Sequence, residues 1–279
     1  MKGLIITADD FGAATEVNEA VEIGHRDGVL TAASLMVAAP GCADAVARAR
    51  RLPGLRVGLH LVLVEGRPAL PRSALPDLVT ADGLFRTDMA AMGADILFRP
   101  KVRAQLAAEI EAQFAAFAAT GLLLDHANTH KHYHLHPTIA GLMLRIGKRY
   151  GLKASRAPVE PRAVLAALEP AAAPSRAWVT EPWARLMRAR YRRAGVAVPD
   201  QVFGLAWSGA MSADRVEGLV QRLPSGLSEL YLHPATRGGF EGAARGYDYA
   251  GELAALVSAR VKAAVAESGA RLGGYSDLL

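Results

Sequence analysis

Cysteine is nearly absent from this sequence: Cys42 is the single one among 279 residues. An internal disulfide needs two cysteines and a thiolate zinc site needs several, so both are excluded. Any metal in this protein must therefore be held by nitrogen and oxygen ligands.

Long apolar runs and aromatic residues are also scarce. No apolar stretch approaches the length of a membrane-spanning helix, and the opening Met1–Thr7 turns polar too soon for a signal peptide. Aromatic residues make up 6% of the chain, and no stacking motif for nucleic acid is visible. The basic residues that give a net charge of +5 are spread out, apart from Arg185–Arg193, which we interpret as a solvated helix face. We therefore expect a cytoplasmic protein that does not bind nucleic acid.

A glycine-rich phosphate loop is missing where a dinucleotide-binding fold would carry one. The first apolar segment runs straight into Asp9-Asp10-Phe11-Gly12 instead. What recurs is a short apolar segment followed by an amphipathic one, which favours parallel strands joined by helical crossovers. The expected strands are residues 4–8, 31–38, 56–63, 122–124, 153–156, 202–207 and 227–232, with a last short one at 271–275. We predict an α/β fold, a distorted or incomplete (β/α) barrel of about seven parallel strands.

The expected helices are interrupted by two longer segments. Residues 65–100 and 158–200 are rich in loop-forming residues, and we interpret them as insertions into a single domain that covers residues 1–279. Thr15 is the expected N-cap of the first helix. An apolar stripe predicts a helix over 101–119, and the final helix is expected as one piece over 251–268.

The richest stretch is Asp125–Pro137. It holds five of the eight histidines, namely His126, His130, His132, His134 and His136. If the chain is extended here, His130, His132, His134 and Asn128 point to one side. Pro137 stands where the next helix would begin. A histidine-rich surface loop is the plainer interpretation, but the position after an apolar strand favours a metal site.

Three other expected strand ends carry polar residues. Asp9 and Asp10 end the first strand, and with Thr15 as the N-cap they are free of a capping role. His60 interrupts the apolar run of the third strand, and His233 follows the seventh. Because the carboxyl ends of parallel barrel strands meet on one face, these side chains are expected to lie close together. One carboxylate and two histidines make a three-ligand metal site, and a second carboxylate and a further histidine supply a base and an acid for hydrolysis.

These residues resemble the YdjC-like (ChbG-type) carbohydrate deacetylases. The resemblance rests on Thr7–Gly12, Gly58-Leu59-His60, Asn128–His134 and Leu232-His233-Pro234, and it runs in order through nearly the whole chain. Within that family, Thr31–Met36 and Leu55–Leu63 resemble the hopanoid-biosynthesis-associated HpnK branch.

The resemblance implies removal of the N-acetyl group from an amino sugar with one divalent metal ion, zinc or magnesium, with manganese or cobalt as further choices. It implies Asp10, His60 and His130 as metal ligands, Asp9 as general base and His233 as acid. Arg156 would orient Asp9 or bind the acetyl oxygen. Many relatives have an aspartate where this chain has Asn128, which removes an anionic partner from the metal site.

For the HpnK branch the implied substrate is a lipid-linked N-acetylglucosamine, an N-acetylglucosaminyl hopanoid, and peripheral contact with the inner membrane would accompany it. One alternative is a deacetylase of soluble chitooligosaccharides, which would need a polar, aromatic-lined groove. The scarcity of aromatic residues weighs against it. A more distant alternative is an iron oxygenase with two histidines and one carboxylate, and a non-catalytic binding protein is the third.

The native metal, the exact substrate and the oligomeric state are not fixed by the sequence. The individual roles of His126, His132, His134 and His136 also stay open. Of these, His132 and His134, with Asn128, are expected to line the site, whereas His136 is expected to cap the following helix.

Overall fold

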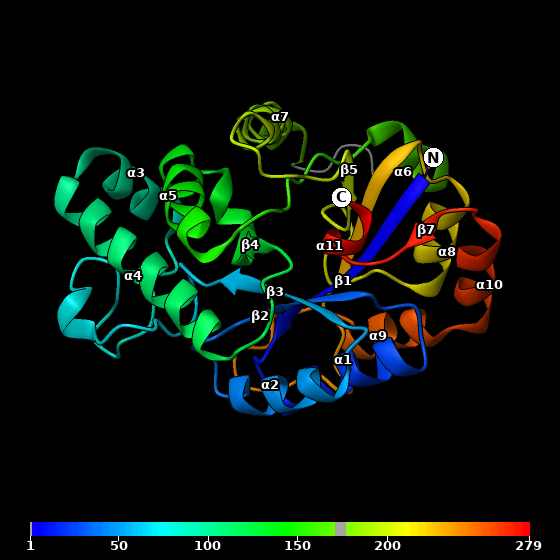
Figure 1. Ribbon diagram of the computed structural model, residues 1–279, viewed down its shortest axis with the longest axis horizontal. Helices are drawn as coiled ribbons and strands as arrows, with labels where there is room; N and C mark the ends of the chain where they lie inside the picture. Colours follow the sequence, from blue (N-terminus) through cyan, green and yellow to red (C-terminus); the bar gives the residue numbers. More distant parts are fainter. Residues whose placement is uncertain (1, 171–176) are drawn as a thin grey trace.

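A parallel sheet that curls into a half-barrel forms the centre of the computed structural model, which describes residues 2–170 and 177–279 (Figure 1). The strand order is β4-β3-β2-β1-β6-β5, with β7 paired to β1, and every pair of named strands is parallel. The strands are β1 (Lys2–Phe11), β2 (Ala32–Leu35), β3 (Arg56–Leu61), β4 (Ala127–Thr129), β5 (Gln201–Phe203), β6 (Gly226–Leu232) and β7 (Arg271–Leu272). The predicted α/β barrel-like fold is confirmed.

Helices surround this sheet (Figure 1). They are α1 (Thr15–Arg26), α2 (Cys42–Arg51), α3 (Met89–Phe98), α4 (Pro100–Ala119), α5 (Pro137–Gly147), α6 (Arg162–Leu168), α7 (Ala177–Arg193), α8 (Ala213–Gln221), α9 (Tyr249–Val257), α10 (Ala259–Glu267) and α11 (Tyr275–Leu278), with 3₁₀ turns η1 (Arg72–Ala74), η2 (His130–Leu135) and η3 (Lys148–Tyr150). The stripe predicted for α4 is buried as expected. None of the described helices is both long and apolar enough to cross a bilayer.

Several sequence-based boundaries were wrong. Leu122–Leu124 is not a strand: Leu123 is 89% exposed, and the fourth strand is only Ala127–Thr129. Ala14, not Thr15, is the N-cap of α1. The predicted final helix is broken at Ser258 into α9 and α10, and Tyr275 begins α11 instead of ending a strand.

The predicted strand 153–156 is an irregular connection between the two edges of the sheet. Ala127 N–H donates to the Ala154 carbonyl on the β4 side, and Val202 N–H of β5 donates to the Val159 carbonyl. The segment thereby spans the gap between β4 and β5 without forming a regular strand, because only isolated bridges hold it. This path carries Arg156 into the interior, where it is fully buried.

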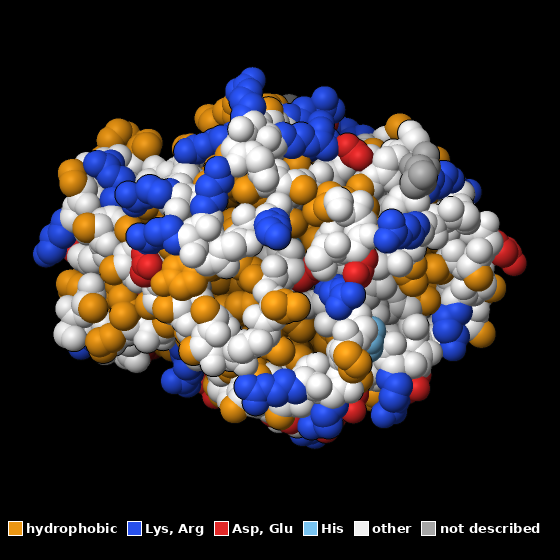
Figure 2. All heavy atoms as spheres, viewed as in Figure 1, with side chains coloured by type: hydrophobic (Ala, Val, Ile, Leu, Met, Phe, Trp, Pro, Cys, Tyr) orange, Lys and Arg blue, Asp and Glu red, His pale blue; other side chains and the backbone are white. Residues whose placement is uncertain are grey.

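The two segments expected as insertions have different structures. Residues 65–100 contain η1, α3 and long loops, whereas 158–200 carries α6 and α7, with residues 171–176 outside the described part. The arginine-rich stretch of α7 is a solvated face as predicted, since Arg185 and Arg190 are exposed. Figure 2 shows basic side chains at the top of the molecule, where α7 lies.

Candidate active site

Two adjacent carboxylates reach the same site because the end of β1 is irregular. Side chains alternate between the faces of a regular strand, so Asp9 and Asp10 would normally point apart. The register of β1 against β2 shifts between Ala8 and Phe11, and Asp10 has a left-handed φ of 63°. Such a backbone is costly for a residue other than glycine and is typical of functional sites. Both carboxylates therefore line one pocket.

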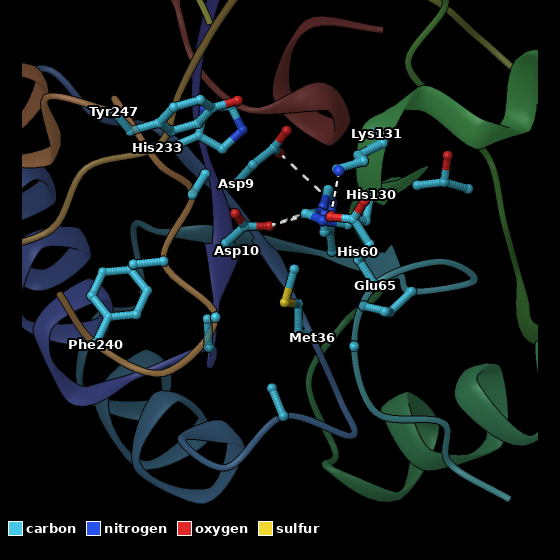
Figure 3. Close-up of a pocket in the computed structure, with 18 of the residues that line it drawn as sticks. Asp9, Asp10, Met36, His60, Glu65, His130, Lys131, His233, Phe240 and Tyr247 are labelled. Carbon is cyan, nitrogen blue, oxygen red and sulfur yellow. Dashed lines mark ion pairs between the residues drawn. The ribbon is translucent and has the colours of Figure 1, made fainter. Parts of the chain in front are cut away.

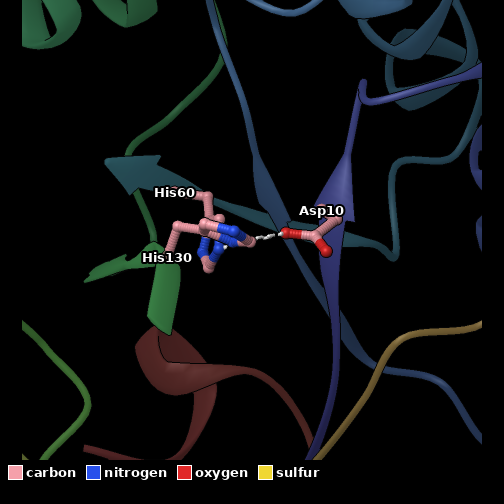
Figure 4. A group of neighbouring side chains, drawn as sticks. All are labelled: Asp10, His60 and His130. Atoms are coloured by element: carbon pink, nitrogen blue, oxygen red, sulfur yellow. Dashed lines mark ion pairs between the residues drawn. The ribbon is translucent and has the colours of Figure 1, made fainter. Parts of the chain in front are cut away.

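Asp10, His60 and His130 converge on one point (Figure 4). They come from the ends of β1, β3 and β4, and their ligand atoms all lie within 4.8 Å of one another. Asp10 Oδ1 is 3.2 Å from both His60 Nε2 and His130 Nδ1. Asp10 Oδ1 and His60 Nε2 are buried without a hydrogen-bond partner. Two nitrogens and one oxygen that face a shared point fit a divalent ion with open positions.

The charges of these groups favour a cation between them. Burial alone would raise the pKa of Asp10, but His130 and His60 outweigh it and lower that pKa well below its ordinary value. Burial would lower the pKa of His60, and the charges of Asp9 and Asp10 raise it. In this arrangement Asp10 could serve as an anionic ligand, and a bound cation would replace the protons that His60 attracts.

Asp9 is fixed from behind by a buried arginine. Arg156 Nη1 lies 2.5 Å from Asp9 Oδ2, and Arg156 Nη2 lies 3.1 Å from Asp9 Oδ1. Arg156 also donates to Glu229 on β6 at 2.8 and 3.1 Å. Burial would raise the pKa of Asp9, but the Arg156 guanidinium, helped by His60 and His233, holds it far below the ordinary value. Asp9 is thus ionised, and Arg156 is not part of the pocket wall.

Asn128 lies between His60 and Asp9. Its Oδ1 accepts from His60 Nδ1 at 2.6 Å, and its Nδ2 donates to Asp9 Oδ1 at 3.2 Å and to Ser34 Oγ at 3.0 Å. The amide therefore supplies the acceptor for His60 without adding a negative charge beside Asp9. We call the buried set Asp9, Ser34, Asn128, Arg156 and Glu229 the supporting layer.

The expectation of an extended chain from His130 to His134 was wrong. The chain turns into η2 after Thr129, with left-handed φ values of 54° at Lys131 and 52° at His132. The three histidines consequently point in different directions. His134 is fully buried below the pocket, where it contacts Thr129 Oγ1 at 2.6 Å and the Arg156 carbonyl at 3.1 Å. Burial also lowers the pKa of His134 to about 3, so it is neutral.

His132 does line the pocket, as expected. Its Nε2 is 2.9 Å from the hydroxyl of Tyr231, while its Nδ1 is buried with no partner. His136 lies outside the pocket lining and caps α5 by accepting from Thr138 N–H, which confirms its expected role. His126 faces the interior, hydrogen-bonded to Asp125 and Ser34.

His233 approaches Asp9 from β6 (Figure 3). Its backbone N–H donates to Glu252, and its Nδ1 is buried without a partner. The ring lies 5.7 Å from the ring of Tyr231 and 5.2 Å from that of Tyr247. The imidazole is therefore held between two phenols with one nitrogen free for a ligand.

The pocket around these groups has a volume of about 800 Å³. These polar groups and many apolar or aromatic side chains together form its wall (Figure 3). Loops after β3 and β6 form the rim, where Lys131 pairs with Glu65 and Arg67 pairs with Glu241 at 2.9 Å. The wall includes Met36, Val62, Leu84, Phe85, Leu205, Tyr231, Phe240, Tyr247 and Tyr249.

Four buried side-chain atoms lack a hydrogen-bond partner within the described part of the chain. They belong to Asp10, His60, His132 and His233, and all four residues line this pocket. Because buried polar groups in folded proteins are nearly always paired, this concentration marks where a ligand must supply the missing partners.

Sequence reasoning missed Glu229, Tyr231 and Tyr247. Glu229 is a lone acid inside the apolar strand Leu227–Leu232, and a buried charge of that kind signals an unseen partner, here Arg156. Tyr231 is two residues away on the same face of that strand, and its ring lies under the Arg156 guanidinium at 4.3 Å. Tyr247 comes from a loop whose sequence carried no such signal.

Several known proteins are similar to this chain in sequence. A carbohydrate deacetylase from Brevibacillus brevis is 40% identical over 147 residues, which are 53% of this chain and 56% of that protein. The chain therefore spans about half the length of this relative. A human carbohydrate deacetylase is 30% identical over 99% of this chain and 90% of that protein.

A solved structure from Enterococcus faecalis is similar over the whole fold. It has 27% sequence identity and a TM-score of 0.77, covers 99% of this chain and 98% of that one, and is assigned provisionally to cellobiose-phosphate cleavage. The family described as YdjC-like protein matches residues 3–267, which include all the pocket residues named above. The chain belongs to the YdjC-like protein family.

Proposed function

We propose that this protein is a metal-dependent carbohydrate deacetylase that hydrolyses the N-acetyl group of an N-acetylglucosamine-type amino sugar. The observation that carries the proposal is the set of unpartnered atoms of Asp10, His60 and His233 around one pocket, beside the ionised Asp9. The names of the relatives, carbohydrate deacetylases, support the same reaction.

Asp10, His60 and His130 would hold the divalent ion. When bound, such an ion polarises an acetamide carbonyl and lowers the pKa of a bound water. Zinc accepts this mixture of nitrogen and oxygen ligands, and magnesium, manganese or cobalt are alternatives.

The residues around the ligands supply the proton transfers. Asp9 takes a proton from the attacking water, because Arg156 keeps its carboxylate ionised and correctly placed. As the bond between the acetyl carbon and the nitrogen breaks, His233 delivers a proton to the departing amine. The products are acetate and the free amino sugar. Since all three guanidinium nitrogens of Arg156 donate to Asp9 or Glu229, we assign it to orienting Asp9 and not to binding the acetyl oxygen.

The size and lining of the pocket bear on the substrate. A volume of about 800 Å³ lies in the upper part of the range of small-molecule pockets, so a sugar with a further attached group is accommodated. Met36, Val62, Leu84 and Phe85 give part of the wall an apolar character. We therefore propose a lipid-linked N-acetylglucosamine, such as an N-acetylglucosaminyl hopanoid, with peripheral membrane contact as its consequence.

A soluble chitooligosaccharide is the second candidate. The sequence as a whole is poor in aromatic residues, but Phe85, Tyr231, Phe240, Tyr247 and Tyr249 all line the pocket. Aromatic rings offer flat faces on which sugar rings pack. The pocket therefore removes the compositional argument against this substrate.

The test is acetate release from purified protein reloaded with each metal in turn. An N-acetylglucosaminyl hopanoid and N,N′-diacetylchitobiose are offered side by side, with Asp10→Ala and His233→Gln as variants. We expect Asp10→Ala to lose metal and activity, and His233→Gln to keep metal but lose roughly 100-fold or more in kcat. Release from the disaccharide alone would select the second substrate. Release from neither, together with oxygen uptake in the presence of ferrous iron, would contradict deacetylation.

A further inference from the structure

A continuous chain of hydrogen bonds leads away from the metal ligand His60 into the protein interior. His60 Nδ1 contacts Asn128 Oδ1 at 2.6 Å, Asn128 Nδ2 contacts Ser34 Oγ at 3.0 Å, and Ser34 Oγ contacts His126 Nε2 at 3.0 Å. His126 Nδ1 then contacts Asp125 Oδ2 at 2.9 Å. All five side chains are buried, with at most 6% exposure.

The direction of the first link is fixed by Asp9. Both oxygens of Asp9 accept hydrogen bonds from Arg156, so the end of the Asn128 amide that faces Asp9 must be the NH₂ group. The carbonyl end then faces His60, whose Nδ1 must carry a proton to donate to it. A neutral imidazole with its proton on Nδ1 has its lone pair on Nε2, the nitrogen that faces Asp10.

The later links continue in the same direction. Because Ser34 accepts from Asn128, its own hydroxyl proton needs an acceptor, and His126 Nε2 is the one within reach in the described structure. His126 Nδ1 then donates to Asp125. Every donor in the chain thus has an acceptor, and the chain ends on a carboxylate.

Residues of α11 donate hydrogen bonds to Asp125 at the far end of this hydrogen-bond chain. Asp125 accepts from the backbone N–H groups of Tyr275 and Ser276 at 3.2 and 2.8 Å and from the Ser276 hydroxyl at 2.7 Å. The Tyr275 ring stacks on His126 with 4.4 Å between centroids. On the other side, a Cβ atom at Gly58 would lie 2.5 Å from the His126 ring, so only glycine leaves room for it. The family match ends at residue 267, before this closing segment.

We propose that Asn128, Ser34 and His126 are positioning residues that fix the tautomer of His60, so that Nε2 presents its lone pair to the metal ion. This inference rests on the proposed metal site and identifies residues remote from the pocket that tune it. Histidine ligands generally depend on such outer partners for orientation and basicity. Here the partner is neutral, and the anionic end of the chain lies three residues further on, at Asp125.

The experiment compares Asn128→Leu and Ser34→Ala with the unmodified protein. Affinity for Zn²⁺ is measured by competition with a chromophoric chelator, and the His60 tautomer by long-range ¹H–¹⁵N spectra of metal-free protein above the pH at which the ring becomes neutral. We expect Asn128→Leu to weaken Zn²⁺ binding roughly 10- to 100-fold and Ser34→Ala roughly 3- to 10-fold, since Ser34 acts through Asn128. The proton of His60 should lie on Nδ1 in the unmodified protein and be shared with Nε2 in the variants.

Ser228→Ala is the matched control. Ser228 is also fully buried in the sheet and hydrogen-bonded, to Gln201 at 2.9 Å, but it lies outside the chain. It should leave both measurements unchanged. Unchanged Zn²⁺ affinity in Ser34→Ala, or an unchanged His60 tautomer in Asn128→Leu, would overturn the proposal. If the unmodified protein bound no divalent ion, the proposed function would fail, whereas the tautomer spectra would still decide on the hydrogen-bond chain.

Discussion

Buried polar atoms are hydrogen-bonded in the supporting layer, whereas several of them lack a partner in the pocket wall above it. In the supporting layer, Asp9, Asn128, Arg156 and Glu229 have partners for their side-chain atoms, most of them at 2.5 to 3.2 Å. In the wall, single atoms of Asp10, His60, His132 and His233 have none. The two regions are in direct contact, because Asn128 of the supporting layer is hydrogen-bonded to His60 of the wall.

This difference separates positioning from binding. An unpaired buried polar group costs about 1–3 kcal/mol, so folding alone gives no reason to retain four of them in one pocket. The hydrogen bonds of the supporting layer hold its side chains in fixed positions. The unpartnered atoms of the wall are available for the ion and the substrate that we propose. Each prediction below tests one side of this division.

The largest effect should come from removing a wall ligand. Asp10→Gly should abolish tight binding of the divalent ion and lower deacetylation by about 1,000-fold or more. The free energy of unfolding of the metal-free protein should change little, because relief of the left-handed φ of 63° by glycine offsets the lost contacts of Asp10 with His60 and His130. Metal titration and urea unfolding measure the two quantities.

Lys131→Gly is the control for that backbone effect. Lys131 has a similar φ of 54° but provides no ligand, so its replacement should leave ion binding intact. Tight ion binding by Asp10→Gly would show that the three-residue metal site is wrong.

Removing a residue of the supporting layer should lower the free energy of unfolding. Arg156→Met leaves Asp9 and Glu229 buried without their cation, so we expect a loss of about 3–5 kcal/mol in the free energy of unfolding. Arg185→Met, on the exposed face of α7, should change it by less than about 0.5 kcal/mol. If urea unfolding gave the two variants the same free energy of unfolding, the ion pairs of Arg156 would be no more stabilising than an ordinary surface ion pair, which would contradict the prediction.

The carboxylate of Asp125, at the end of the hydrogen-bond chain, should make the free energy of unfolding depend on pH in the acid range. Burial would raise the pKa of Asp125, but His126 and Ser276 lower it from 3.8 to about 2. The folded state therefore binds fewer protons than the unfolded state, and this stabilisation is complete above about pH 4 and lost as the pH falls toward 2. The shift corresponds to about 2 kcal/mol, which Asp125→Asn should lack. Urea unfolding at pH 5 and pH 3 measures it, and identical pH dependence in the variant and the unmodified protein would contradict it.

The smallest effect concerns the free nitrogen of His132. Glutamine places a polar group near Nε2 and preserves the contact with Tyr231, whereas asparagine places one near Nδ1. If Nδ1 contacts substrate, His132→Gln should raise KM about 10-fold and His132→Asn should not. Steady-state kinetics on both variants decides, and the reverse order would assign the role to the Tyr231 contact.

The sequence predicted the parts of the site that follow from local pattern. Apolar runs that end in Asp9-Asp10, His60 and His233 were recognised as strand ends, and the parallel fold brings these residues to one pocket. Prediction failed where a pattern was read as regular structure. Leu122–Leu124 looked like a strand, but the backbone pairs with β3 only from Asp125 onward. The alternation of His130, His132 and His134 did not place them on one side, because the backbone leaves the sheet at η2.

The amino-acid sequence by itself determined the fold class and the order along the chain of the residues that meet at the pocket. These properties depend on side-chain type and short-range periodicity, which a sequence contains directly. Only the tertiary structure decided that Arg156 pairs with Asp9 and Glu229 and that Asn128 is hydrogen-bonded to His60. It also decided that Tyr275 and Ser276 donate to Asp125, the last residue of the hydrogen-bond chain. Those pairs lie 68 to 151 residues apart. The partner of a buried charge depends on which strands become neighbours, and no local pattern records that choice.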